Sequence, residues 1–340
     1  MHTTMIHTRG LARHFTVRKQ TIKAVRGLDL CVESGELVAL LGPNGAGKST
    51  TLRMLTTLLP PTAGTAYVAG HDVTSNQRDV RRRIGYIGQG NGAGHSQRGR
   101  DELISQGRAY GMSASTARAR AAELSASLDL DNVVDRVVSS LSGGQRRRLD
   151  IALGLIHAPE LLFLDEPSTG LDPQNRANLQ EHIRRLRAEH GTTIVLTTHY
   201  LDEADQLAER VIVIDHGRII ADDTPARLKA DHAGDRIALT FGHTDDARRA
   251  IACSAGIAAG AQIGQTGATV AIQADGGAQL APKLMRSLDE SGIDVASVEV
   301  ARPTLDDVFL NLTGRSLRED TSVAATTHEP DTAVAQEVNA

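Results

Sequence analysis

The sequence predicts an α/β domain built on a largely parallel sheet, followed by a smaller α+β domain. Over residues 1–225, short apolar runs alternate with glycine-rich turns and amphipathic stretches. The runs are continuously apolar, as strands are when both faces of a parallel sheet are buried. From about residue 235 the pattern changes, and a chain of 340 residues is long enough to form a second core.

Four apolar runs are expected to be strands of the parallel sheet. They are Leu37–Leu41, Leu161–Leu164, Thr193–Thr197 and Val211–Ile214. Helices are expected between them, because apolar residues there recur at helical spacing, as Leu179, Ile183 and Leu186 do within 175–189.

Residues 226–315 are expected to form the second domain. The predicted order is a strand at 236–241, a helix at 245–252, strands near 262 and at 269–273, a helix at 279–288, a strand at 295–300 and a last helix. This order resembles that of a split βαβ sandwich. Residues 316–340 are rich in Thr, Ala, Glu and Asp, so we expect a disordered tail.

A phosphate-binding loop follows the first predicted strand. The motif G-x-x-x-x-G-K-[ST] is matched by Gly42, Pro43, Asn44, Gly45, Ala46, Gly47, Lys48 and Ser49, with Thr50 opening a helical segment. Backbone N–H groups and the helix N-terminus suit α- and β-phosphates. Lys48 is expected to reach the β- and γ-phosphates and the Ser49 hydroxyl to ligate Mg²⁺. The motif predicts a nucleotide site, and its strand-to-helix context disfavours an ordinary glycine-rich turn.

Two acids end the second predicted strand. Asp165 and Glu166 follow Leu164, and the ends of parallel strands meet at one edge of a sheet, so we expect both beside the phosphate loop. Asp165 is expected in the Mg²⁺ shell. Glu166 is expected to orient and deprotonate the attacking water.

A second anion site is predicted at Leu141–Gln145, before a helical segment. Ser142 offers a hydroxyl and Gly143 and Gly144 offer amides at a helix N-terminus, with Gln145 next. One chain has no use for two such sites on one γ-phosphate, unless they face each other across a dimer. With the phosphate loop and the acid pair, this segment resembles the signature of the ATP-binding cassette (ABC) ATPases, which are P-loop NTPases.

The resemblance implies ATP between the phosphate loop of one copy and the signature of a second copy, with a helical subdomain at about residues 90–157. Gln89 looks like the Q-loop glutamine that senses Mg²⁺ or water, and His199 like the switch histidine at the γ-phosphate. Asp172, in the segment 168–173 that resembles the D-loop, would cross the dimer interface. Phe15 is the aromatic expected on adenine, with a place in the core as an equal alternative.

The end of the second domain narrows the resemblance. Pro303–Gly314 is similar to the end of daunorubicin-resistance-type ATP-binding subunits, and the likeness covers about residues 5–315. It implies a separately encoded membrane permease and export of a drug, an antibiotic or a lipid. One departure is Gly88–Gly99, which is glycine-rich where the family presents a more apolar surface to the permease, so we expect a mobile loop.

The composition argues against nucleic acid as a partner. With 37 basic and 41 acidic side chains, 2% aromatics and no Trp, the chain has neither the charge nor the stacking surface for nucleic acid. The arginine triplets 81–83 and 146–148 are interpreted as solvated helix faces.

No apolar run approaches about 20 residues and no signal sequence is visible, so we expect a peripheral protein at the cytoplasmic face of the membrane. A soluble ABC switch on ribosomes or DNA, and an importer ATPase, remain as alternatives. Intact Glu166 and His199 speak against a paralogue that binds ATP without turnover.

Overall fold

The computed structural model describes residues 3–17, 19–90, 92–94, 96–258, 260–274 and 276–314. The predicted tail 316–340 lies outside these residues. The chain divides into two compact units, 1–223 and 224–340, each described by itself. Among the described residues, no helix combines the length and apolar character that a membrane crossing needs.

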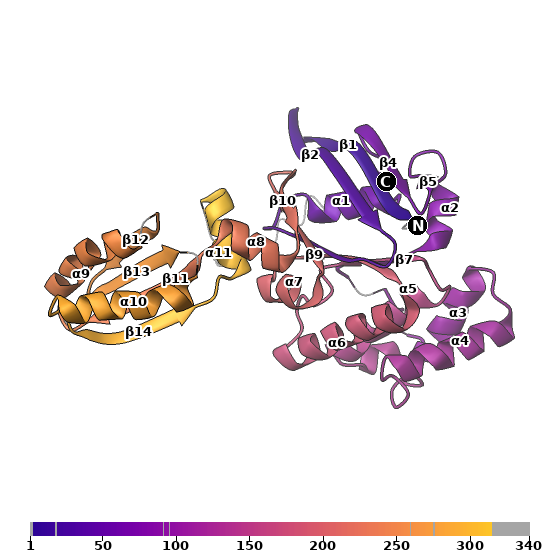
Figure 1. The fold of residues 1–340 in the computed structure, drawn as a ribbon. Coiled ribbons are helices and arrows are strands. Elements are labelled where there is room, and N and C mark those ends of the chain that lie inside the picture. The colour runs from indigo at the N-terminus through magenta and orange to yellow at the C-terminus, as the bar shows by residue number, and fades with distance from the viewer. Residues whose placement is uncertain are drawn as a thin grey trace. The chain divides into compact units, whose positions relative to one another are not determined.

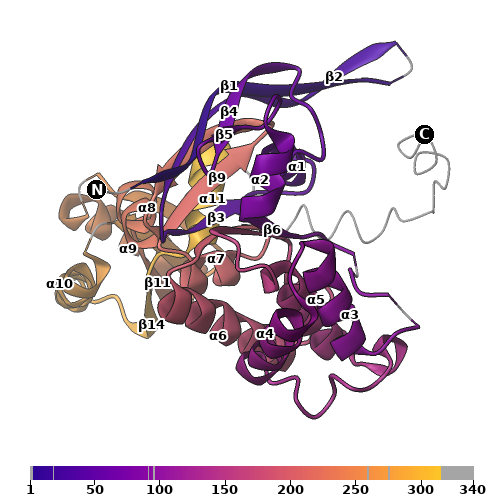
Figure 2. The same cartoon turned by 90° about the vertical axis from the view of Figure 1, so that its right-hand side faces the viewer.

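A parallel sheet runs through the first unit (Figures 1 and 2). It has six strands in the order β10-β9-β3-β8-β7-β6. Its strands are β3 (Leu37–Leu41), β6 (Ile84–Ile87), β7 (Leu161–Asp165), β8 (Thr193–Thr198), β9 (Arg210–Asp215) and β10 (Arg218–Asp223). All neighbours are parallel except β10, which returns antiparallel to β9. Every residue of β3 and β7 is buried, which confirms the continuously apolar strands.

An antiparallel sheet, which the sequence analysis did not predict, adds four strands in the order β2-β1-β4-β5. They are β1 (Thr4–Val17), β2 (Gln20–Glu33), β4 (Ala63–Val68) and β5 (His71–Asp72). Register shifts interrupt the β1–β2 ladder, so the apolar alternation that marks a strand is broken. The two sheets share one core, in which Ile6, Val25, Leu40 and Phe163 are buried.

The helices of the first unit are α1 (Lys48–Leu55), α2 (Gln77–Arg83), α3 (Gly99–Ala109), α4 (Ala114–Ser127), the short η1 (Val138–Ser140), α5 (Gly143–Leu155), α6 (Pro173–His190) and α7 (Leu201–Leu207). Helices α3, α4 and α5 pack on one another. With α6 they lie on the side of the parallel sheet opposite the antiparallel sheet (Figure 2). The parallel sheet is therefore covered on both faces.

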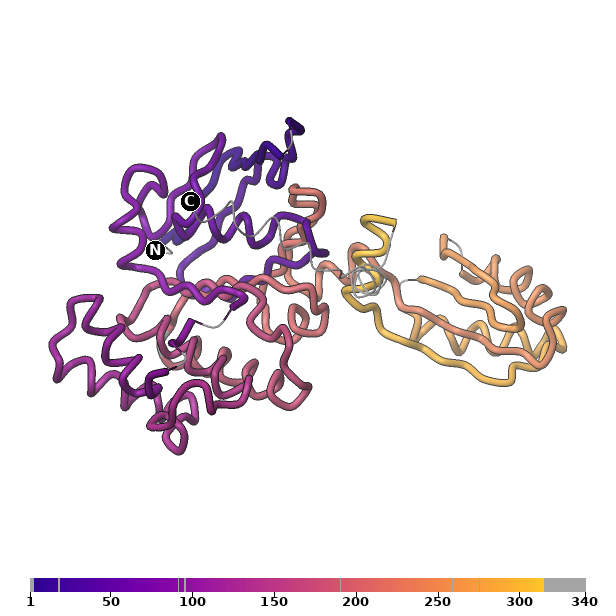
Figure 3. The backbone as a smooth tube through the Cα atoms, turned by 180° about the vertical axis from the view of Figure 1, so that it is seen from behind, coloured from indigo at the N-terminus to yellow at the C-terminus, as the bar shows by residue number. Residues whose placement is uncertain are grey.

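The second unit contains α8 (Pro225–His232), β11 (Asp235–Phe241), α9 (Thr244–Ile257), β12 (Gln262–Thr266), β13 (Thr269–Ala274), α10 (Gly277–Glu290), β14 (Val295–Ala301) and α11 (Leu305–Thr313), traced in orange to yellow in Figure 3. Its antiparallel sheet has the order β12-β13-β11-β14, which confirms the split βαβ sandwich. Helices α9 and α10 cover the buried Ile237, Leu239, Val270 and Ile272. Helix α8 was not predicted; Thr224 caps its N-terminus and it packs against α11.

Candidate active site

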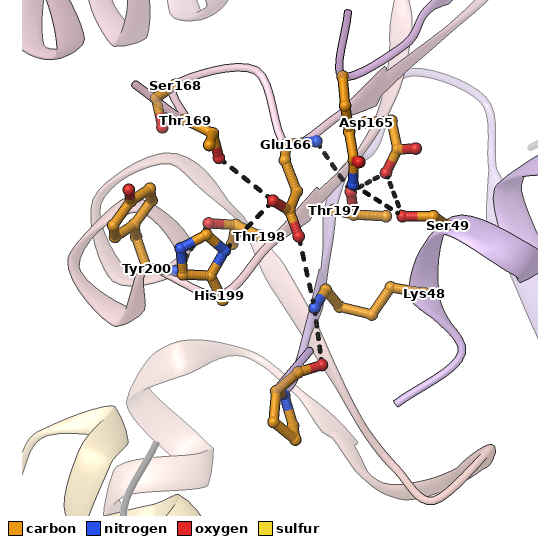
Figure 4. A network of polar contacts seen from close by, with 12 residues as sticks. Lys48, Ser49, Asp165, Glu166, Ser168, Thr169, Thr197, Thr198, His199 and Tyr200 are labelled. Atoms are coloured by element: carbon orange, nitrogen blue, oxygen red, sulfur yellow. Dashed lines mark hydrogen bonds and ion pairs between the residues drawn. The ribbon is translucent and has the colours of Figure 1, made fainter. Parts of the chain in front are cut away.

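The carboxyl ends of neighbouring parallel strands bring the predicted residues together. The phosphate loop follows β3, Asp165 ends β7 with Glu166 next, and His199 follows β8. Since β8 lies between β3 and β7, the three segments meet at one edge of the sheet (Figure 4). Strand direction predicted the place of Asp165 and Glu166, and the family resemblance predicted that of His199.

Two glycines of the phosphate loop are required by close backbone contacts. Gly47 caps α1 with φ of 104°, and a Cβ there would lie 2.5 Å from the Ala24 carbonyl oxygen. A Cβ at Gly42 would lie 2.1 Å from the Ile214 carbonyl oxygen. The loop is thus fitted between β2 and the end of β9, and only glycine permits the approach.

Lys48 is buried at the centre of the site. Its Nζ donates to the carbonyl oxygens of Gly42, at 2.7 Å, and Pro43, at 3.0 Å, and lies 3.7 Å from Glu166 Oε1. Burial lowers the pKa of Lys48, while the carboxylates of Glu166 and Asp165 oppose that shift. The ammonium is held between the loop and the acid pair.

Oxygen atoms gather around Ser49. Its hydroxyl donates to Asp165 Oδ1 at 2.8 Å and accepts from Gln89 Nε2 at 3.2 Å. Thr197 Oγ1 donates to the same Oδ1 at 2.7 Å, while Asp165 Oδ2 is buried and has no hydrogen-bond partner among the described residues. A hydroxyl with a carboxylate is a donor set that suits Mg²⁺, which takes oxygen ligands and shares them with phosphates. These residues therefore fit the ion that the sequence analysis predicted.

Glu166 is held in an uncommon backbone conformation, with φ of +47°. Its N–H lies 2.9 Å from Thr197 Oγ1 and 3.2 Å from the Thr197 carbonyl oxygen. Its Oε2 accepts from Thr169 Oγ1 at 3.2 Å and lies 3.4 Å from His199 Nδ1. A non-glycine residue with positive φ is strained, and the surrounding hydrogen bonds hold Glu166 in this conformation.

Charge and burial act against each other on this carboxylate. Burial raises the pKa of Glu166, but His199, Lys48 and Thr169 outweigh it and hold that pKa below the ordinary 4.5. The carboxylate is ionised at neutral pH. It can accept a proton from a bound water molecule.

A cavity of about 480 Å³ opens beside these groups. Its lining includes residues 44–50, Gln89 and Glu166 of the predicted site. Residues that sequence reasoning missed also line it: Ile22, Lys23, Ala24, Arg26 and His216. His216 could have been found, because it follows β9, which lies parallel to β3, whereas nothing in the sequence places β2 at the loop.

Phe15 does not line this cavity. It pairs across the β1–β2 hairpin with Ile22, which does, and the Arg13 guanidinium lies 4.8 Å from its ring centroid. Its stacking on adenine stays a prediction.

The structure does not bring the signature segment to the cavity. Ser142 caps α5 by accepting from the Gln145 N–H at 3.3 Å, and Gln145 Oε1 accepts from the Ser142 N–H at 2.9 Å. Neither residue lines the phosphate-loop cavity, nor do Gly143 and Gly144. Asp172 caps α6 and accepts from the Asn175 N–H at 2.9 Å.

One interpretation of the arginine triplets is wrong. Arg81, Arg82 and Arg83 are exposed as expected, but Arg147 is 8% exposed. The guanidinium of Arg147 is stable in the interior because three backbone carbonyl oxygens accept hydrogen bonds from it.

The chain matches known families over both units. The ABC transporter family matches residues 25–169, and the C-terminal domain of DrrA1-3-like ATP-binding proteins matches 224–313. The daunorubicin/doxorubicin resistance ATP-binding protein DrrA of Streptomyces peucetius is 42% identical over 315 residues, covering 92% of this chain and 93% of that protein. The chain belongs to the DrrA-type ATP-binding proteins of the ABC family.

Other relatives of this DrrA-type protein agree with that placement. The Nod factor export ATP-binding protein I of Burkholderia orbicola is 39% identical, covering 87% of this chain and 93% of that protein. Among solved structures, the dimeric bacterial ABC transporter cassette MJ0796 superposes with a TM-score of 0.60 at 26% identity, covering 65% of this chain and 98% of that one. The predicted fold class is confirmed, and the chain is an ATP-binding, ATP-hydrolysing ABC subunit.

Proposed function

We propose that two copies of this DrrA-type protein enclose two ATP molecules head to tail and drive a separate membrane permease. The observation that carries the proposal is the division of the machinery within one chain. Lys48, Ser49, Asp165 and Glu166 form one cluster, whereas Ser142 of the signature lies outside its cavity. A second copy would supply the missing signature. The dimeric structure of the related MJ0796 cassette supports this arrangement.

Each group of the site has a role in ATP binding. Lys48 and the backbone N–H groups of residues 44–50, which line the cavity, would hold the phosphates. Ser49, Asp165 and Gln89 would hold Mg²⁺, which when bound offsets negative charge on the phosphates. The site of adenine would lie beside Ile22, with Phe15 next to it.

Hydrolysis would use the acid beside the lysine. Glu166 accepts a proton from the attacking water, and His199, 3.4 Å from Glu166, orients that carboxylate and reaches the γ-phosphate. From the second copy, Ser142, Gly143, Gly144 and Gln145 would bind the same phosphate, and Asp172 would approach across the interface. Loss of phosphate removes contacts between copies, so the dimer opens and the permease changes state.

The transported compound is inferred from relatives. Several relatives are named as daunorubicin or doxorubicin resistance proteins, and another as a Nod factor exporter. We therefore infer export of a drug, an antibiotic or a lipid, with the protein at the cytoplasmic face of the membrane. Co-purification with an integral membrane chain would support this over a ribosomal or DNA-associated switch, and the direction of transport would separate it from an importer.

The chemistry is tested by Glu166→Gln, which keeps the shape of the side chain and removes its basicity. We expect ATP turnover to fall about 100-fold or more, with ATP affinity changed less than about threefold, since the phosphate contacts remain. Measurement of phosphate release and of nucleotide binding checks both. The matched control is Glu160→Gln, an exposed glutamate paired with Arg83, which should keep full turnover. Normal turnover in Glu166→Gln would remove Glu166 as the base.

A further inference from the structure

Two buried side chains of α5 bind the backbone before and after Gln89 in the sequence. Arg147 and Asp150 are three residues apart on this helix, so they lie on the same face. They are 8% and 4% exposed. Neither residue lines the phosphate-loop cavity.

Arg147 connects three parts of the site through backbone oxygens. Its Nη1 donates to the carbonyl oxygen of Gly88 at 2.7 Å, directly before Gln89. Its Nε donates to the Pro167 carbonyl oxygen at 2.8 Å, and its Nη2 to that of Asp165 at 3.3 Å, on either side of Glu166. The planar guanidinium can make these contacts at once, which a lysine cannot.

Asp150 contacts the segment on the other side of Gln89. Its Oδ1 accepts from the N–H groups of Gly92 and Ala93, both at 3.0 Å. Such charge-assisted bonds are stronger than neutral ones. A Cβ at Gly92 would lie 3.3 Å from the same oxygen, so the glycine allows the close approach.

We propose that Arg147 and Asp150 are positioning residues that hold Gln89 at Ser49 and tie it to the helix that carries the signature. Gln89 Nε2 donates to Ser49 Oγ at 3.2 Å, so its placement depends on the backbone on both sides. Helix α5 begins at Gly143, beside the Ser142 cap. A displacement of this tip by the nucleotide of the second copy would therefore reach Gln89 of the first. The inference rests on the proposed function, because it assigns Gln89 a part in the ATP site.

A double-mutant cycle on the full-length protein tests the proposal. We expect Arg147→Ala and Asp150→Ala each to lower kcat for ATP hydrolysis about tenfold, with ATP affinity within about twofold of the wild type. Combined with Gln89→Ala, Asp150→Ala should lower kcat by less than about twofold further, because residues acting through one group are not additive. Arg147→Ala should be partly additive with Gln89→Ala, since it also removes contacts to the Asp165 and Pro167 carbonyl oxygens beside Glu166. Arg147→Lys and Asp150→Asn keep part of the contacts, so their kcat should lie between that of the wild type and that of the alanine variant. They replace an alanine variant that does not fold.

The matched control is Arg146→Ala. Arg146 donates to the carbonyl oxygens of Val138 and Ser139, at 3.3 and 3.4 Å, and not to the Gln89 segment. It should keep kcat within about twofold. Hydrogen exchange gives a readout independent of turnover: the amides of Gly92 and Ala93 should exchange faster in Asp150→Ala but not in Arg146→Ala.

Unchanged kcat, fully additive effects with Gln89→Ala, or unchanged exchange of these amides would each overturn the proposal. A wild-type protein that hydrolyses no ATP would contradict the proposed function instead. In that case the exchange measurement alone decides whether Asp150 holds the segment.

Discussion

At Gly47 the backbone of the phosphate loop packs against β2. Its φ of 104° and the 2.5 Å approach of a Cβ to the Ala24 oxygen leave no room for a side chain. In Gly47→Ala the loop must move, and strain of about 1–3 kcal/mol is expected. We predict at least about a tenfold loss of ATP affinity, measured by equilibrium binding.

Gly191→Ala is the matched control for this change. Gly191 also has a positive φ, 61°, but no atom of the described residues lies within 4 Å of its Cβ position, and it ends α6 away from the cavity. It should carry the backbone strain without the loss of affinity. Wild-type affinity in Gly47→Ala would contradict the role of the glycine.

Glu203 of α7 connects this helix to the segment that follows Glu166. It is 1% exposed, and its Oε1 accepts from Ser168 Oγ at 2.8 Å. Burial raises the pKa of Glu203, and Thr198 and Ser168 offset this only in part. The folded protein therefore binds this proton more tightly than the unfolded chain does, and stability is lost as pH rises from the ordinary 4.5 through the raised pKa.

Glu203→Gln removes that dependence, since the amide is neutral and its oxygen can still accept from Ser168. We predict a higher free energy of unfolding than the wild type at pH 8. The difference should shrink towards pH 4.5. Chemical denaturation at a series of pH values checks this. A variant that is less stable than the wild type at pH 8, or a difference independent of pH, would contradict the raised pKa of Glu203.

Four strands of the parallel sheet, β3, β7, β8 and β9, could be predicted because each is a short apolar run with polar residues at its end. Strand direction then placed Asp165 and Glu166 beside the phosphate loop, and the family resemblance placed His199 there. The β1–β2 hairpin could not be predicted, because its bulges break the alternation. With it, Ile22 and Ala24 were missed at the cavity. Arg147 was misplaced because a charged residue next to other arginines favours a solvated face, and only tertiary structure supplies the three carbonyl oxygens that accept from it.

Within the described part of the chain, the two segments predicted to bind phosphate do not both line the phosphate-loop cavity. The phosphate loop has Lys48, Glu166 and Gln89 around it, whereas Ser142 and Gln145 cap α5 elsewhere. We still predict, without a test, that the chain divides into two functional domains near residue 225 and that residues 90–157 act as a helical subdomain. The account therefore depends on a second copy completing each ATP site.

Light scattering on the full-length Glu166→Gln variant, in which hydrolysis is blocked, tests this claim most directly. The account predicts the mass of one copy, 36.2 kDa, without nucleotide, and twice that mass, roughly 72 kDa, with ATP and Mg²⁺. Lys48→Ala, which loses the phosphate contact, should remain at the mass of one copy. A variant that binds ATP and yet stays single at every concentration, alone and with its membrane partner, would contradict the shared site.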